Sequence, residues 1–180
     1  MLLYFDRAFR NAALAQLADL LEPNGMLVCG TDWALTTEAR YFTYRKRNNC
    51  LSDCEFTFSL DNVAPLGMVP WYTLHDDDAE SEMLTGMVGI LRADHRFVGA
   101  FIEASNAIRA ELGLPPRGSD AYDAAANANA SPAELWTASA RHSERLAEMF
   151  GSAAVDALAR QGLSVRLNAI GHVAIALPAV

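Results

Sequence analysis

The sequence predicts an α/β protein in which part of a sheet is followed by a mainly helical region. Within residues 2–31, a helical repeat of apolar residues lies between two short apolar segments. Two segments follow within residues 40–60, and in each of them apolar and polar residues alternate. Helical periodicity begins at Glu80. We therefore expect an α/β domain over residues 1–75 and a mainly helical C-terminal region over 76–180 that ends in a β-hairpin.

The first part of the chain predicts a strand, a helix and a second strand. Asp6 is positioned to cap the helix, and Pro23-Asn24-Gly25 ends it, because Pro cannot continue a helix and Asn-Gly tolerates positive φ. Residues 26–29 have the composition of a strand that is buried on both faces. This order is half of a right-handed parallel crossover. The expected apolar face of the helix consists of Phe9, Ala13, Leu17 and Leu20.

Residues 40–60 predict a β-hairpin. The segments RYFTYRK at 40–46 and CEFTFSL at 54–60 both alternate, and Arg47-Asn48-Asn49 supplies the turn between them. Residues 66–74 are apolar, but Pro70 interrupts them, so we expect an extended segment packed across the sheet.

The second part predicts helices and a final pair of strands. Residues 117–130 are expected to be a loop or weak helix, with a linker as the alternative, and a helix is expected over 131–151. A short helix follows and stops at Gly162, and residues 163–167 and 172–177 form two strands. Two apolar helical faces are expected, one formed by Met83, Met87, Ile90 and Leu91 and the other by Phe97, Phe101, Ala104 and Ile108.

Charge and composition exclude several classes of function. The 180-residue chain has a formal net charge of −8, which argues against nucleic acid as a partner, since phosphate backbones need a basic surface. No apolar stretch approaches the length of a membrane span, and no signal peptide is recognised. The 3 cysteines suit reduced thiols. We therefore expect a cytoplasmic protein that binds no membrane.

Several segments near the N-terminus carry a family resemblance. Residues 1–6 (MLLYFD), the Pro23-Asn24-Gly25 turn and the strand after it resemble the fourth and fifth strands of class I S-adenosylmethionine-dependent methyltransferases. Within that superfamily the chain most resembles the branch that methylates chemotaxis-receptor glutamates, which also has a late strand similar to residues 44–46. Residues 30–33 stand where that branch has Gly-His-Ser-Glu. The resemblance implies that residues 1–75 form part of a Rossmann-like methyltransferase sheet, from strand 4 onward, with a late antiparallel hairpin at its far edge.

The resemblance also implies a cofactor and the residues that would face it. S-adenosylmethionine would contact the end of the first strand, and Thr31 and Asp32 would face the substrate. Tyr4 could line the methyl-transfer pocket or be a core aromatic residue, and no catalytic residue is assigned. The residues expected to bind the cofactor are Met1, Leu2, Leu3 and Tyr4.

The sequence lacks the Gly-rich loop with which such enzymes hold their cofactor. We therefore expect a C-terminal portion of a methyltransferase that is not active alone, with the missing N-terminal half or a protein substrate as its partner. The alternative is a non-catalytic protein-interaction module, in which the helical region from Asp76 onward recognises a partner.

Other polar residues have simpler interpretations. Residues 75–78 (HDDD) are either a metal site or, as we favour, the acidic start of a helix. His142 is expected to be packed rather than catalytic, and Cys50 and Cys54 have no matching histidines, so no metal site is predicted. The strand that contains Tyr44, Arg45 and Lys46 is basic, and it either meets an acidic partner or, as we favour, forms a solvated edge.

Overall fold

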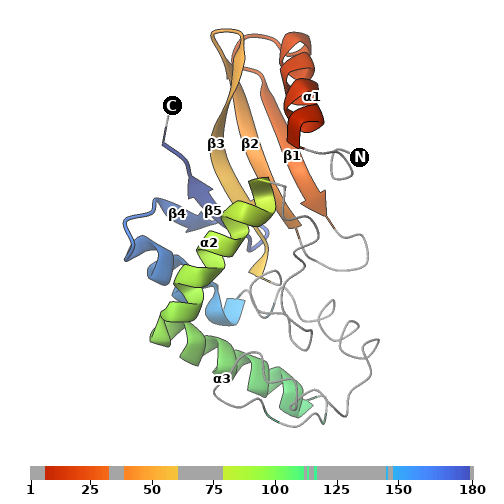
Figure 1. Ribbon diagram of the computed structural model, residues 1–180. Helices are drawn as coiled ribbons and strands as arrows, with labels where there is room; N and C mark the ends of the chain where they lie inside the picture. Colours follow the sequence, from red (N-terminus) through yellow and green to blue (C-terminus); the bar gives the residue numbers. More distant parts are fainter. Residues whose placement is uncertain are drawn as a thin grey trace.

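The computed structural model describes residues 7–32, 39–60, 79–111, 113, 116, 145 and 148–178. The fold is α/β, as the sequence predicts. Five strands form one open sheet in the order β1-β2-β3-β5-β4, and each neighbouring pair is antiparallel (Figure 1). Residues 148–159 are also helical. The elements are α1 (Arg7–Leu20), β1 (Met26–Asp32), β2 (Ala39–Arg47), β3 (Cys50–Phe58), α2 (Ala79–Ala93), α3 (His95–Glu111), β4 (Val165–Leu167) and β5 (Val173–Ala176).

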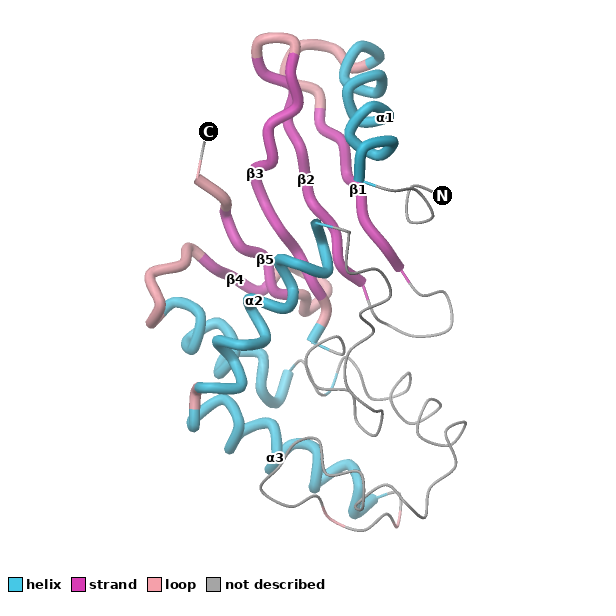
Figure 2. Tube along the Cα trace, viewed as in Figure 1, coloured by secondary structure: helices cyan, strands magenta, loops and turns pink. Residues whose placement is uncertain are grey.

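The helices α1 and α2 lie along the sheet, and α3 continues beyond its end (Figures 1 and 2). Phe42 and Phe56 on the strands pack with Leu84 and Val88 of α2 in one core, so α2 covers the face from which these phenylalanines project. Helix α1 contacts the same face, because Nη2 of its Arg10 lies 3.7 Å from Sγ of Cys29 on β1, and Cys29 is the partner of Phe42 in the sheet. The sheet therefore has one face against helices.

The predicted β2–β3 hairpin is confirmed, with its turn at Asn48-Asn49. Both asparagines have positive φ, at 49° and 64°, the conformation of a two-residue type I′ turn, which asparagine adopts more readily than most residues. The predicted turn after α1 is confirmed as well, with Asn24 at φ 64°. The C-terminal hairpin around residues 168–171 also forms where the sequence predicts it.

The arrangement of the sheet differs from the expected one. The β2–β3 hairpin lies in the middle of the sheet rather than at its far edge, because β5 pairs with β3 and adds the C-terminal hairpin there. Strand β1 pairs antiparallel with β2 and is not buried on both faces, since Met26 and Val28 are 53% and 60% exposed. Residues 1–6, expected to form the preceding parallel strand, lie outside the described residues.

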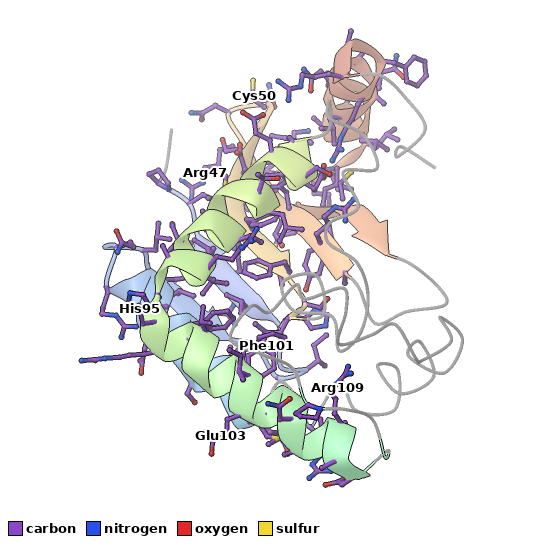
Figure 3. All side chains as sticks on the ribbon, turned by 60° about the horizontal axis from the view of Figure 1, so that its bottom comes forward. Arg47, Cys50, His95, Phe101, Glu103 and Arg109 are labelled. Carbon is purple, nitrogen blue, oxygen red and sulfur yellow. The ribbon has the colours of Figure 1, made fainter. Side chains whose placement is uncertain are left out.

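The core confirms one predicted helical face and corrects two others. In α3 the predicted apolar face is buried, and Figure 3 shows Phe101 directed inward and Glu103 directed outward. In α2 the predicted Leu91 is buried, but the rest of the face is shifted by one residue. Leu84 and Val88 are buried, whereas the predicted Met83 and Met87 are only partly buried.

In α1 the predicted face is wrong at its two ends. Phe9 and Leu20 are 53% and 81% exposed, whereas the predicted Ala13 and Leu17 are half-buried. The buried residues are Arg10 and Ala18, and Leu14 is half-buried. The physical reason is that Arg10 forms an ion pair in the interior, and this turns the helix so that its neighbours along the same stripe face the sheet.

The connection between α2 and α3 is fixed by Asp94. Its Oδ1 atom accepts hydrogen bonds from the backbone N–H groups of Arg96 and Phe97, at 3.0 and 2.9 Å, as an N-cap does. Its Oδ2 atom accepts from Arg160, at 2.5 Å, and these hydrogen bonds lower the pKa of the Asp94 carboxyl group, the one to Arg160 most. The cap therefore joins the start of α3 to the end of the helix over 148–159.

The expected helix end at Gly151 is wrong, because the chain is helical through this residue. A Cβ atom at Gly151 would lie 2.9 Å from Cδ1 of Leu167, so glycine allows this helix to approach β4 closely. Gly162, at φ 81°, follows the helix end as predicted. The expected cap at Asp6, the segments 66–74 and 117–130, and residues 131–144 lie outside the described residues.

Gly30 permits the close pairing of β1 and β2, since a Cβ atom there would overlap the backbone of Arg40 and Tyr41. We predict that Gly30→Ala lowers the free energy of unfolding by about 2 kcal/mol or more, because the backbone cannot move aside easily. The matched control is Gly99→Ala in α3, where a Cβ atom meets nothing within 4 Å. That change should stabilise the protein by about 0.5–1 kcal/mol. Urea denaturation measures both, and an equal effect of the two variants would contradict the tight pairing.

Candidate functional site

A buried ion pair joins α1 to the start of α2. Arg10 donates from Nη2 to Oε1 of Glu80, and the two side chains are 7% and 0% exposed. The same nitrogen lies 3.7 Å from Sγ of Cys29 on β1. Oε2 of Glu80 has no hydrogen-bond partner within the described part of the chain. Because charges attract strongly in a low-dielectric interior, this pair holds two segments that are 70 residues apart in sequence.

Tyr44 on β2 lies next to this ion pair. Burial raises the pKa of its phenol from 10.0 to about 12, and the positive charge of Arg10 opposes that rise. The phenol is therefore protonated at neutral pH and can both donate and accept a hydrogen bond.

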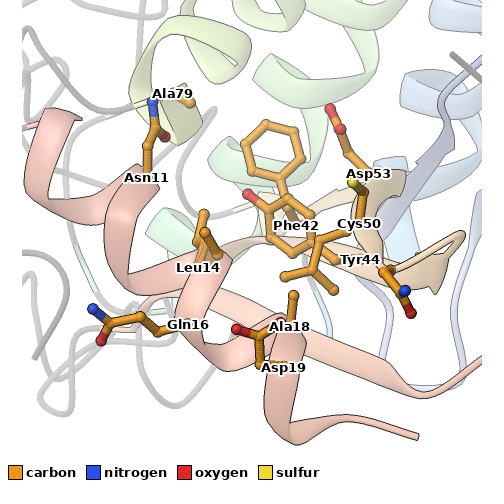
Figure 4. Close-up of a pocket in the computed structure, with 13 residues that line it drawn as sticks. Asn11, Leu14, Gln16, Ala18, Asp19, Phe42, Tyr44, Cys50, Asp53 and Ala79 are labelled. Carbon is orange, nitrogen blue, oxygen red and sulfur yellow. The ribbon is translucent and has the colours of Figure 1, made fainter. Parts of the chain in front are cut away.

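An open groove runs between α1 and the β2–β3 hairpin, and we call it the α1–hairpin groove (Figure 4). Its volume is about 660 Å³, within the range of pockets that hold small ligands or a few side chains of a partner. The apolar part of its lining includes Leu14, Ala18, Phe42 and Leu51. The polar part includes Asn11, Asp19, Tyr44, Asn49 and Asp53.

The two acidic residues come from opposite walls of the groove. Asp19 belongs to the last turn of α1, and Asp53 to β3 next to Tyr44 of β2. Both are exposed, and neither makes an ion pair with another described residue. The groove therefore combines an apolar lining with two carboxylates at its solvent side, which suits a ligand with an aliphatic body and a positive charge.

The predicted site residues lie elsewhere or outside the described part. Met1, Leu2, Leu3 and Tyr4 are not among the described residues. Thr31 and Asp32 are the last residues of β1, opposite Arg40 and Ala39 of β2, and they do not line the α1–hairpin groove. The groove lies toward the other end of β2, where Tyr44 pairs with Leu27.

Sequence reasoning did not identify the groove. Asn11, Asp19 and Asp53 belong to no motif, and only the packing of α1 on the hairpin brings them together. In the sequence, Tyr44 stands out only as part of a basic strand, and Cys50 only as a potential metal ligand.

The other candidate residues carry no site within the described part. Residues 75–78 and His142 lie outside it. Cys50 is exposed, and Sγ of Cys54 donates to the carbonyl oxygen of Thr43 at 3.2 Å. The described residues contain no group of three His, Cys, Asp or Glu side chains that could hold a metal ion. Among the described helices, none has the length and apolar character needed to cross a membrane.

We compared the chain with protein-family models, curated proteins and solved structures, and none of them matches it. The functional conclusion therefore depends on the chemistry of the site itself.

The two acidic residues at the start of α2 allow a matched test of the ion pair. We predict that Glu80→Ala lowers the free energy of unfolding by about 3–5 kcal/mol, because it leaves the Arg10 charge buried and unpaired. Glu82→Ala removes an exposed pair with Arg7, whose side chains are 71% and 52% exposed, and should cost less than about 1 kcal/mol. Urea denaturation measures the difference, and similar losses for both variants would show that the buried pair has no special role.

Proposed function

We propose that this chain is a non-catalytic protein-interaction module, and that its α1–hairpin groove binds a lysine or arginine side chain of a partner protein. The observation that carries the proposal is the pair of exposed carboxylates, Asp19 and Asp53, on either side of an apolar lining. Lysine and arginine place their methylene chains along apolar surface and keep the charged end in water. The groove offers both environments within one pocket.

The charge of the chain supports the same partner. Its formal net charge is −8, which attracts basic surfaces over long distances and raises the rate at which they associate. The acidic side chains of the groove add a local attraction that fixes where a positive group is bound. An interaction of this kind should weaken as salt is added.

The groove does not lie where the methyltransferase resemblance would place a cofactor or substrate. Doubly wound parallel sheets bind their ligands beyond the carboxyl ends of the strands, whereas the sheet here is antiparallel. In β1 that end is Thr31-Asp32, whereas the groove is lined by the β2–β3 turn at the opposite end of the strands.

A labelled peptide that alternates leucine and lysine tests the proposal, with fluorescence anisotropy as the measurement. We predict saturable binding that the double variant Asp19→Asn/Asp53→Asn weakens about tenfold, as expected for the loss of close charge pairs. A peptide that alternates leucine and glutamate should not bind.

The control variant is Asp156→Asn/Glu103→Gln, which removes the same two charges from exposed positions on other helices. It should change the affinity by less than about twofold, since distant exposed charges are screened. An equal loss in both double variants would contradict the groove as the binding site.

The sequence resemblance supplies a second candidate, a C-terminal portion of an S-adenosylmethionine-dependent methyltransferase. The observation that favours it is the unit of α1, the Asn24 turn and β1, which follows the order expected from the family. In this proposal residues 1–4 face the cofactor, and Thr31 and Asp32 face the substrate.

Calorimetric titration with S-adenosylhomocysteine, the demethylated product, tests whether this chain binds the cofactor by itself. The interaction-module proposal predicts no heat of binding from a sample whose folding is verified by circular dichroism, and a methyltransferase portion without the Gly-rich loop would give none either. Saturable heat that Tyr4→Ala reduces, and that Cys50→Ser leaves unchanged, would contradict it and favour the methyltransferase proposal.

A further inference from the structure

A second hollow lies on the other side of the β2–β3 turn, and we call it the basic-turn pocket. Its volume is about 660 Å³, and it is separate from the α1–hairpin groove except that Asn49 lines both. Two turns form its walls, the one that follows α1 and the one that joins β2 to β3. The residues that matter here are Asn24, Arg45, Lys46, Arg47 and Asn49.

Two backbone hydrogen bonds hold these walls together. The N–H group of Asn24 donates to the carbonyl oxygen of Lys46 at 3.2 Å. The N–H group of Lys46 donates to the carbonyl oxygen of Gly25 at 2.9 Å. Asn24 and Asn49 both have positive φ, at 64°, so each wall is a defined tight turn. The pocket is therefore formed before any ligand arrives, which reduces the entropic cost of binding.

The register of the sheet leaves two arginines in this pocket without acidic neighbours. A shift between Thr43 and Tyr44 places Arg45 opposite Met26 on one side and Ser52 on the other. Arg47 is opposite Cys50. Asp53 pairs instead with Tyr44, which belongs to the other face of the sheet.

The charges of Arg45 and Arg47 are therefore not neutralised within the described part of the chain. The Arg45 guanidinium group lies 3.8 Å from Sδ of Met26, and neither arginine has a carboxylate partner among the described residues. Lys46 differs, because its Nζ donates to the carbonyl oxygen of Leu21 at the end of α1, at 2.7 Å. In a protein of net charge −8, two such arginines in one preformed pocket indicate a site for an anion.

The spacing of the two arginines indicates which anion. Residues two apart in a strand project from the same face, and their Cα atoms are about 7 Å apart. Guanidinium groups on side chains of that reach can converge on one tetrahedral anion, and the planar fork of arginine matches phosphate oxygens in pairs. The side-chain amides of Asn24 and Asn49 can add neutral donors. We propose that the basic-turn pocket binds the phosphate group of a small phosphorylated molecule.

Titration calorimetry at low salt with phenyl phosphate and with pyrophosphate tests this proposal on the full chain. Both probes should bind saturably, and Arg45→Gln and Arg47→Gln should each weaken binding about tenfold. Arg45→Lys keeps the charge but loses the fork, so it should weaken binding less than Arg45→Gln does. Benzoate, which has a carboxylate in place of the phosphate, should bind more weakly than phenyl phosphate.

The matched control is Arg96→Gln, which removes one exposed positive charge from α3. It should leave the affinity within about twofold of the unmodified chain, and circular dichroism verifies that each variant is folded. The proposal is overturned if neither probe gives saturable heat, if Arg96→Gln weakens binding as much as the hairpin variants do, or if benzoate equals phenyl phosphate. These outcomes do not depend on the α1–hairpin groove, since its acidic residues are absent from the basic-turn pocket.

Discussion

The ion pair between Arg10 and Glu80 joins α1 to α2, and the placement of these two helices on the sheet depends on it. A charged pair is costly to remove from water, so it persists in an interior only when its partners are held in a favourable geometry. Here that requirement fixes which side of each helix faces the sheet. On α1 Arg10 and Ala18 are buried and Leu14 between them is half-buried, and on α2 the buried stripe runs from Glu80 through Leu84 to Val88.

The two surface hollows follow from how α1 is attached at its two ends. Near its start, Arg10 joins it to α2, and at its end the carbonyl oxygen of Leu21 accepts from Nζ of Lys46 on β2. Between these attachments the helix lies beside the hairpin and leaves the α1–hairpin groove, which is lined partly by Leu14. The second attachment also brings the turn at Asn24 against the hairpin and so forms the basic-turn pocket.

The sequence predicts the local structure of this protein well and its long-range arrangement poorly. The α3 face, both hairpins and the asparagine turns follow from periodicity and turn chemistry, and the structure confirms them. The predicted faces of α1 and α2 differ from the observed ones because Arg10 and Glu80 are buried, whereas charged residues usually face the solvent. The place of β5 next to β3 has no local signal, since Glu55 and Ala176 meet only through tertiary packing.

The candidate site could not be predicted from the sequence for the same reason. Asp19 and Asp53 belong to no motif, and each becomes part of a site only when α1 packs on the hairpin. The claim that the buried pair creates this arrangement is tested most directly by hydrogen exchange of the α1 amides in Glu80→Ala. We predict that exchange accelerates more in Arg7–Leu20 than in the β2–β3 hairpin, because α1 loses its attachment near Arg10. Unchanged exchange in α1, or equal acceleration in α1 and the hairpin, would contradict the account.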